Sequence, residues 1–413
     1  MQRGVLIGVA GALLALVSCG SAAAATHHSA RSWAAAQIRV VTSVGLMGTK
    51  SPATFRPNDA LTRQALTNLV FDLQQLLAPP PPPPAPTAPS PAPEPAQTTT
   101  TDPTATTITT DPTTTTTTET TTTETTTTTT ETTTVAAPTP PPPAQPPKVA
   151  HGAAASTMTE LDTQLVDGVG LDAAAAEFAH GASAAGLSIP PRFGTEVAAR
   201  LLGLRIDHPA REDGLERLPD DPATRAEAAY SAAQILHTSG WLVPIVQNLA
   251  DTFSLPQYST WQRRILDTAV ARIGMPYVWG GTSDGPEIDF GVAARGGYDC
   301  SGFVWRVYKL TAYPGEGDLA SVLRGRTTYV MSGEVPHSEL VDFEHLQPAD
   351  VIFFGPKGPR SSPSVVDHMG IYLGNGWFIH SSDYGVALAR LDGWYRREFA
   401  WARRPLREAG LAG

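Results

Sequence analysis

The sequence predicts a chain of mixed class, with helical segments near the N-terminus, a long unfolded stretch, and a C-terminal domain in which helices precede strands. Three observations predict this. The 413 residues include 38 prolines and 36 glycines but only 16% charged side chains, which is unlike a single compact globule. Proline and threonine dominate residues 79–147. Apolar residues recur at helical spacing on both sides of that stretch, whereas patterns typical of buried strands follow residue 349.

Charge and cysteine content exclude several classes of protein. The net charge of −10 is the opposite of the basic footprint expected of a nucleic-acid-binding protein. The two cysteines are Cys19 and Cys300. Because Cys19 falls in a predicted leader, we expect no internal disulfide and no metal site built from several cysteines. The remaining thiol, that of Cys300, is therefore a candidate for a chemical role in an exported chain.

Residues 1–25 are typical of an export signal. Arg3 precedes an uncharged, mostly apolar stretch, Val5–Val17, that is too short to span a bilayer. The residues before Cys19 resemble a lipoprotein signal, in which the cysteine is lipidated and becomes the new N-terminus. The small residues Ser21–Ala25 suit ordinary signal cleavage instead. Both hypotheses remain open, and both predict an exported protein.

Residues 79–147 form a Pro/Thr-rich segment that we expect to be a disordered linker. Such a composition buries too little apolar surface to offset the entropy of ordering. Its proline-rich ends favour the extended polyproline conformation, so the segment could reach roughly 200 Å. It is either a spacer through a cell wall, with candidate O-glycosylation sites, or a neutral linker.

The flanks of the linker, residues 26–78 and 151–256, carry a repeated motif. Pro57–Arg63 aligns with Pro219–Arg225, and in both copies an Asp and a Thr precede an apolar-periodic helix. Asp and Thr are good helix N-caps, which explains part of the pattern. A weaker third copy is expected at Phe193–Glu196, before the helix 197–202.

This helix, loop and helix unit resembles the S-layer homology repeat, a family that docks proteins on anionic wall polymers. The resemblance implies that Arg63 and Arg225 contact the anion, and that Asp59 and Asp221 shape the loop. The alternative is a pair of capped helical hairpins without a ligand.

The C-terminal domain, residues 257–413, carries the candidate catalytic residues. A capping box at Ser259 predicts a helix that ends at Gly274. Cys300 opens a second predicted helix, where free N–H groups and the positive end of the helix dipole lower a thiol pKa and can hold an oxyanion. His368 and His380 fall on two predicted strands, 367–374 and 377–380, joined by a short turn that would make the histidines neighbours. One could act as a base and the other could orient it.

Taken singly, Cys300 could be a small buried hydrophobe and His380 a strand histidine with satisfied hydrogen bonds. The surrounding segments, PYVWGG from Pro276, DCSGF from Asp299, DHMGIYLG from Asp367 and FIH ending at His380, favour catalysis. They resemble, in this order, the NlpC/P60 family of papain-like cysteine peptidases, over about residues 261–404.

The NlpC/P60 resemblance implies an α+β fold with a nucleophile helix packed on an antiparallel sheet that carries the histidines. It implies that Cys300 is the nucleophile, His368 the general base and His380 the orienting third residue. It also implies substrate-binding positions at three residues near the nucleophile, namely Tyr277, Asp299 and Ser301. The family cleaves peptidoglycan stem peptides, most often between D-γ-glutamate and a diamino acid.

Three departures from the family pattern stand out. Residues 282–298 are longer than usual and contain Asp284, Glu287 and Asp289, so we expect a lid or an acidic cleft entrance. The segment from Leu323 to Met331 includes Arg326 where the family often has a run ending in glutamine. Ala349 replaces a common glycine, a change we expect to be harmless.

Together these observations predict an exported, wall-associated D,L-endopeptidase of the C40-like cysteine peptidase class. We expect no cofactor, because the thiolate supplies the nucleophile. The expected partners are peptidoglycan stem peptides and anionic wall polymers, and Cys19 could add a lipid anchor to the outer face of the cell membrane. Two alternatives remain: a non-catalytic wall-binding or adhesion protein, and an amidase or acyl transferase on the same fold.

Overall fold

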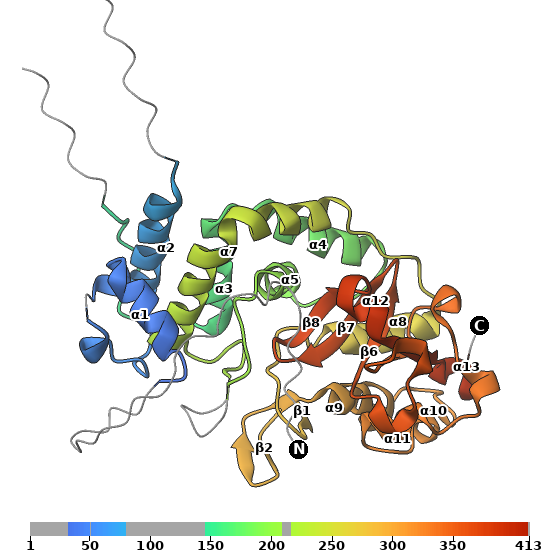
Figure 1. Ribbon diagram of the computed structural model, residues 1–413. Helices are drawn as coiled ribbons and strands as arrows, with labels where there is room; N and C mark the ends of the chain where they lie inside the picture. The colour runs from blue at the N-terminus through green and yellow to red at the C-terminus, as the bar shows by residue number, and fades with distance from the viewer. Residues whose placement is uncertain (1–31, 50, 80–144, 209–215, 412–413) are drawn as a thin grey trace, which may run out of the picture. The chain divides into compact units, whose positions relative to one another are not determined.

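A computed structural model describes residues 32–49, 51–79, 145–208 and 216–411 (Figure 1). The predicted signal peptide with Cys19, and residues 80–144 of the predicted linker, lie outside the described residues. Within the described ranges, no helix combines the length and the apolar character that crossing a bilayer requires.

The two flanks of the linker fold together into one helical unit, which we define as described residues 32–79 and 145–256. α2 packs against α3 and α7, and α1 packs against α7, so residues from before and after the linker share one core (Figure 1). The sequence led us to expect two separate repeat regions. The helices of this unit are α1 (Ala35–Ser43), α2 (Arg63–Leu77), α3 (Met158–Gly168), α4 (Asp172–Ala184), α5 (Phe193–Leu201) and α7 (Arg225–Asp251).

Three threonine-capped turns meet at the centre of the helical unit. Thr62, Thr157 and Thr224 each accept a hydrogen bond from the backbone N–H three residues on, at the starts of α2, α3 and α7. The residues just before them form a closed backbone ring of 2.8 Å hydrogen bonds, from Leu61 N to Ala223 O, from Ala223 N to Ser156 O and from Ser156 N to Leu61 O. This ring has approximate threefold symmetry and joins segments from both flanks of the linker.

The third copy of the motif lies at Thr157, and the prediction that it lies at Phe193–Glu196 was wrong. α5 does begin at Phe193, but no side chain caps it, and Thr195 falls inside the helix. In the copy at Thr157 a methionine, Met158, follows the threonine where the other copies have arginine. This substitution hid the copy from a comparison based on the Thr-Arg pair.

The C-terminal domain is built around an antiparallel sheet that, in the described chain, has the strand order β8-β7-β6-β5-β9. α8 starts at the predicted Ser259 capping box but ends at Val270, before the predicted Gly274, and β6 and β7 agree with the predicted strands to within two residues at each end. The strands are β1 (Thr282–Ser283), β2 (Glu287–Asp289), β3 (Val292–Ala294), β4 (Gly297–Tyr298), β5 (Val351–Phe354), β6 (His368–Gly374), β7 (Trp377–Ser382), β8 (Gly385–Arg390) and β9 (Phe399–Arg403). The helices are α8 (Thr260–Val270), α9 (Cys300–Trp305), α10 (Leu319–Val322), α11 (Thr328–Ser332), α12 (Gly393–Glu398) and α13 (Pro405–Glu408), and a π-helix at Arg306–Leu310 continues α9.

Apolar side chains cover both faces of the sheet. α9 packs against β6 and β7 on one face, and a second cluster that includes Ile352, Phe354 and Phe378 fills the other. This two-sided burial explains why the strands are apolar almost throughout rather than alternating.

Ala349, just before β5, has a positive φ of 69°. A side chain in this left-handed conformation costs about 1 kcal/mol or more. Replacing the family's glycine therefore carries a strain cost, because only glycine adopts this conformation without strain.

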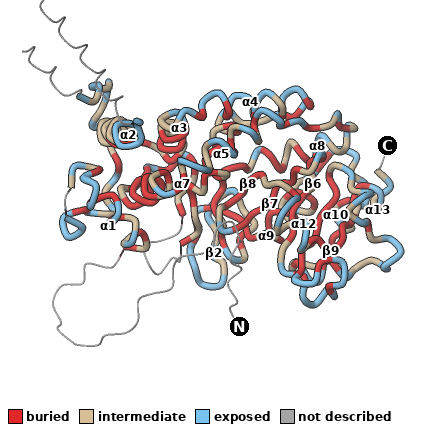
Figure 2. The backbone as a smooth tube through the Cα atoms, turned by 45° about the horizontal axis from the view of Figure 1, so that its top comes forward, coloured by how far each residue is buried: buried red, intermediate tan, exposed pale blue. Residues whose placement is uncertain are grey.

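The helical unit packs directly against the C-terminal domain. Phe178 of α4 and Phe253 meet Trp377 of β7 edge-on, with ring centroids 6.0 and 5.1 Å from that of the tryptophan. α5 contacts β8, and most residues of α5, β7 and β8 are buried (Figure 2). The strand that carries His380 thus has the helical unit on its flank.

Candidate active site

Cys300 is the first residue of α9 and is partly exposed. Its neighbour Asp299 is the N-cap and accepts hydrogen bonds from the Gly302 N–H and the Ser301 hydroxyl, the latter at 2.9 Å. At a helix start the first backbone N–H groups have no partner inside the helix. The thiol therefore lies beside free donors and the positive end of the dipole.

Arg326 fixes this helix start from the other side. Its guanidinium donates to Ser301 Oγ at 2.7 Å, to Asp299 Oδ1 at 3.2 Å and to the Gly280 carbonyl at 2.7 Å. Asp299 and Ser301, both predicted to bind substrate, are buried and engaged with protein groups. The sequence indicated no role for Arg326, although this residue lies in a segment that departs from the family pattern.

His368 opens β6 and His380 lies in the middle of β7, and the structure brings them together. Their Nε2 and Nδ1 atoms, respectively, are 2.7 Å apart. The hairpin register pairs Ile371 with Ile379 and Tyr372 with Phe378, which places the two imidazoles on one face. His380 is 2% exposed, whereas His368 is partly exposed, so His368 is the member of the pair that a ligand can reach.

The strand of His368 also reaches the thiol. Backbone groups of Ser301 and of Met369, the residue after His368, hydrogen-bond the Cys300 thiol and favour its thiolate. Thr328 Oγ1 lies 3.5 Å from the sulfur. These contacts place the nucleophile helix and the histidine hairpin at one site.

Burial decides the protonation of the resting site. Together with the smaller effect of the Asp299 carboxylate, it raises the pKa of the Cys300 thiol to about 12. Burial lowers the pKa of His368 to about 4, and burial and the neighbouring His368 lower the pKa of His380. The resting thiol and both imidazoles are consequently neutral near pH 7.

An aromatic cage that sequence analysis missed surrounds the histidines. Tyr395 of α12 lies edge-on to His380, with ring centroids 5.4 Å apart. Phe354 lies 5.8 Å from His368, and Phe378 lies 4.8 Å from His380. These rings line the pair and help to bury His380, whereas His368 stays partly exposed. Phe354 and Phe378 lie in apolar segments close to the two histidines, so the sequence could have indicated that they line the site. No local pattern indicated the same for Tyr395.

Burial raises the pKa of the Tyr277 phenol, and the nearby Cys300 and Asp299 raise it as well. Tyr277 pairs through the backbone with Tyr298, the residue before Asp299. A raised pKa keeps the phenol protonated, so Tyr277 can donate a hydrogen bond to a carbonyl or carboxylate.

The long segment 282–298 contains a hairpin, β2–β3, and neighbouring groups engage two of its three carboxylates. Asp284 pairs with Arg272 at 2.8 Å and with Arg306 at 3.0 Å, and Glu287 accepts hydrogen bonds from the backbone of residues 282 and 283. The carboxylates of Asp284 and Glu287 hold the hairpin in place. Its tip instead exposes Ile288 and Phe290, which are 75% and 82% exposed.

The four residues predicted to bind a wall polymer all lie near the threefold turns. Arg63 pairs with Glu160 at 2.5 Å while both side chains keep about a third of their surface exposed. Arg225 donates to the carbonyls of Phe55 and Met47 at 2.8 and 3.3 Å. Asp59 pairs with Arg56 at 2.8 Å, and Asp221 pairs with Arg295 of the β3–β4 loop at 2.7 Å. Any anion would compete with these internal partners.

Residues 274–404 match the NlpC/P60 family, so the C-terminal part of the chain is an NlpC/P60 domain with the expected α+β fold. The chain is 30% identical over 142 residues to the murein DD-endopeptidase MepH of Escherichia coli, covering 34% of this chain and 44% of that protein. It is 33% identical over 146 residues to a gamma-D-glutamyl-L-lysine dipeptidyl-peptidase of Bacillus cereus, covering 34% and 36%.

Among solved structures, an NlpC/P60 family protein from Bacillus cereus is 29% identical, with 37% of this chain and 42% of that chain covered and a TM-score of 0.27. The chain thus spans less than half the length of these relatives. The similarity covers the C-terminal domain.

Proposed function

We propose that this protein is a cysteine endopeptidase that cleaves peptidoglycan stem peptides. The observation that carries the proposal is that the Cys300 thiol, at the start of α9, is hydrogen-bonded by the backbone of Met369, the residue after His368, and that His368 in turn lies 2.7 Å from His380. The names of the relatives support a wall substrate, since one is a murein endopeptidase and the other a γ-D-glutamyl-L-lysine dipeptidyl-peptidase.

The arrangement of nitrogens assigns the proton transfers. Because His368 Nε2 faces His380 Nδ1, His368 Nδ1 is the nitrogen left to take the thiol proton. In that tautomer the His368 Nε2–H donates to His380 Nδ1, and His380 carries its own proton on Nε2. His380 thereby holds the base in one orientation and stays hydrogen-bonded when His368 becomes charged.

The reaction then follows the two-step course of nucleophilic catalysis. The Cys300 thiol gives its proton to His368, and the sulfur bonds to the carbonyl carbon of the scissile amide. N–H groups at the start of α9 stabilise the oxyanion. The C–N bond breaks as the amine takes the proton from His368, leaving a thioester. Water attacks the thioester with His368 as the base, and this releases the carboxylate and restores the thiol.

The bond we propose is that between D-γ-glutamate and the diamino acid. One relative is named for a γ-D-glutamyl-L-lysine bond and the other for a DD bond, so the names alone leave two choices. The family resemblance of the segments around Cys300 and His368 favours the D-γ-glutamyl bond. Tyr277, with its phenol kept protonated by a raised pKa, is the donor that we assign to a substrate oxygen.

We further propose that the protein is exported and held at the wall. A cleaved or lipidated N-terminus, with Cys19 as the lipidation site, and the Pro/Thr-rich linker support this role. The S-layer homology resemblance and the threefold turns support anionic wall polymers as a partner of the helical unit. Arg63→Ala should weaken salt-sensitive binding of the full chain to purified walls. Because the Arg63–Glu160 pair is half-exposed, little folding stability should be lost.

The test of the enzymatic proposal is hydrolysis of purified peptidoglycan by the full chain. The wild type should release soluble peptides, and Cys300→Ala should release none while it keeps its fold, since the change removes one sulfur atom. Wall binding without hydrolysis by the wild type would make this a non-catalytic wall-binding protein.

A further inference from the structure

We propose that Arg200 of the helical unit is a positioning residue for the active site. Its guanidinium holds the ends of two backbone segments, one leading to Tyr277 and the other coming from His380. The inference deepens the proposed function, on which its kinetic readout rests. A second readout, the reactivity of the Cys300 thiol, needs no substrate.

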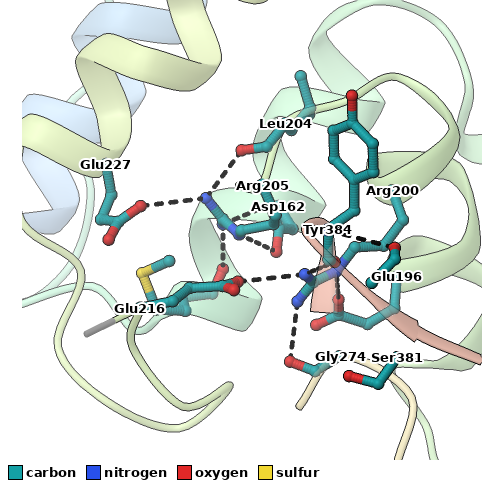
Figure 3. Close-up of polar contacts among 12 residues, drawn as sticks. Asp162, Glu196, Arg200, Leu204, Arg205, Glu216, Glu227, Gly274, Ser381 and Tyr384 are labelled. Atoms are coloured by element: carbon teal, nitrogen blue, oxygen red, sulfur yellow. Dashed lines mark hydrogen bonds and ion pairs between the residues drawn. The ribbon is translucent and has the colours of Figure 1, made fainter. Parts of the chain in front are cut away.

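Arg200 lies in α5 and reaches out of the helical unit into the C-terminal domain (Figure 3). It donates to the Gly274 carbonyl at 2.8 Å and to the Tyr384 carbonyl. Its charge is balanced by Glu196 and Glu216, 3.3 and 3.1 Å away, and only 3% of its side chain is exposed. One planar, buried guanidinium therefore joins three parts of the chain that are far apart in sequence.

Both segments present a glycine to this side chain. A Cβ on Gly385 would lie 2.6 Å from an Arg200 nitrogen, and one on Gly274 would lie 2.5 Å from the Glu196 carboxyl carbon. Both glycines have positive φ, 73° and 87°. The C-terminal domain thus leaves room at two positions for the α5 Glu–Arg pair, as expected of a fitted contact.

Both segments are close in sequence to residues of the candidate active site. Gly274 is three residues before Tyr277, and Tyr384 is four residues after His380, in the turn between β7 and β8. Gly274 N donates to Val386 O, and Val386 N donates to Met275 O, so the segments are also bonded to each other. Holding this paired end fixes the register of the β7–β8 hairpin. Because β7 carries His380, it also fixes the position of His380 relative to His368.

Arg205 provides a matched control within the same buried network (Figure 3). It is 1% exposed and pairs with Asp162, as Arg200 pairs with Glu196. Its other contacts all lie in the helical unit, namely Leu204 O, Ser231 Oγ, Met158 O and the Glu227 carboxylate, the last at 4.0 Å. Arg205→Lys therefore tests loss of a buried guanidinium without touching the active-site segments.

The experiment compares Arg200→Lys, Arg205→Lys and His380→Ala in the full chain. A lysine keeps the charge but cannot span both carbonyls, because it lacks the planar fork. If Arg200→Lys fails to fold, E196Q/R200M/E216Q removes the arginine together with the carboxylates it would leave unpaired. Each variant is assayed for kcat and KM on stem peptides and for the rate of Cys300 alkylation by iodoacetamide, with the modified site located by mass spectrometry.

Arg200→Lys should lower kcat by about 10-fold or more, with KM changed much less, since small displacements of catalytic groups act on the chemical step. It should also shift the alkylation rate in the same direction as His380→Ala. Arg205→Lys should leave both quantities near the wild-type values. If Arg200→Lys and the triple variant behave like Arg205→Lys, the positioning role is wrong. If the wild type cleaves no stem peptide, the proposed function fails and alkylation alone decides the role of Arg200.

Discussion

At the scale of single residues, the proposed mechanism gives the two histidines different roles: His368 is the base and His380 orients it. His380→Ala should reduce kcat by about 10² to 10³, because His368 loses the partner of its Nε2–H. His368→Ala should be more severe, because the proton acceptor itself is lost. His380→Asn, which keeps a hydrogen-bonding group, should recover part of the activity. Steady-state kinetics on a stem peptide measure all three, and an equal loss for both alanine variants would instead make His380 the base.

The raised thiol pKa predicts a neutral resting site. Since burial raises the pKa of Cys300 to about 12, the alkylation rate should climb between about pH 6 and about pH 10 without a plateau, following the thiolate fraction. Burial lowers the pKa of His368 to about 4. The base is active when unprotonated, so kcat/KM should stay level as pH falls to about 5 and drop near pH 4. An alkylation rate that is already level above pH 5 would indicate a preformed thiolate–imidazolium pair.

At this same scale the sequence indicated the candidate catalytic residues more directly than the residues that hold them in place. Cys300, His368 and His380 lie within recognisable segments, and their strand and helix contexts follow from local patterns. Arg326 and Tyr395 could not be predicted, because each acts through a contact that only the tertiary fold creates. Arg326 reaches Asp299, 27 residues away. Ala349 shows the same limit, because its positive φ is set by the turn before β5.

At the scale of elements, the β2–β3 hairpin is the feature most specific to this chain. Phe290 sits at its tip with a positive φ of 49°, an unusual conformation for an aromatic residue. A Cβ on Gly280 would meet the Phe290 ring at 2.4 Å, so the ring covers the segment whose Gly280 N–H bonds Asp299. The neighbouring Trp279 is 70% exposed. The hairpin thus places an exposed aromatic surface beside the nucleophile.

Phe290→Asn should raise KM for long stem fragments and leave kcat nearly unchanged. Asparagine tolerates the left-handed conformation and suits a two-residue hairpin turn with glycine, so the hairpin should persist while the aromatic surface is reduced. Phe290→Tyr is the matched control that keeps the ring. An unchanged KM in Phe290→Asn would make the hairpin tip a neutral surface insertion.

The helical elements show which features a local motif can predict and which it cannot. Threonine capping correctly located the starts of α2 and α7, since a cap is a local interaction. The third capped turn was missed because Met158 replaces the arginine used to find it. The ring that joins the three turns connects residues on either side of the linker, and no pattern within one flank predicts that pairing.

At the scale of the whole molecule, the helical unit and the C-terminal domain pack against each other. The two flanks of the linker share one core, and α4 and α5 pack on β7 and β8. Composition alone separates the linker from the rest, but the contact between α5 and the β7–β8 turn joins residues 184 apart. Isolated flanks, or the C-terminal domain alone, would lack these contacts, so functional tests belong on the full chain.

The central claim is that Cys300 cleaves a stem peptide in peptidoglycan. The most direct measurement is mass spectrometry of intact peptidoglycan digested by the full chain, with Cys300→Ala digested in parallel. We expect muropeptides that end in D-glutamate, together with peptides that begin with a free diamino acid, and neither product from the variant. Cleavage at the sugar–peptide amide, or the same products from Cys300→Ala, would contradict it.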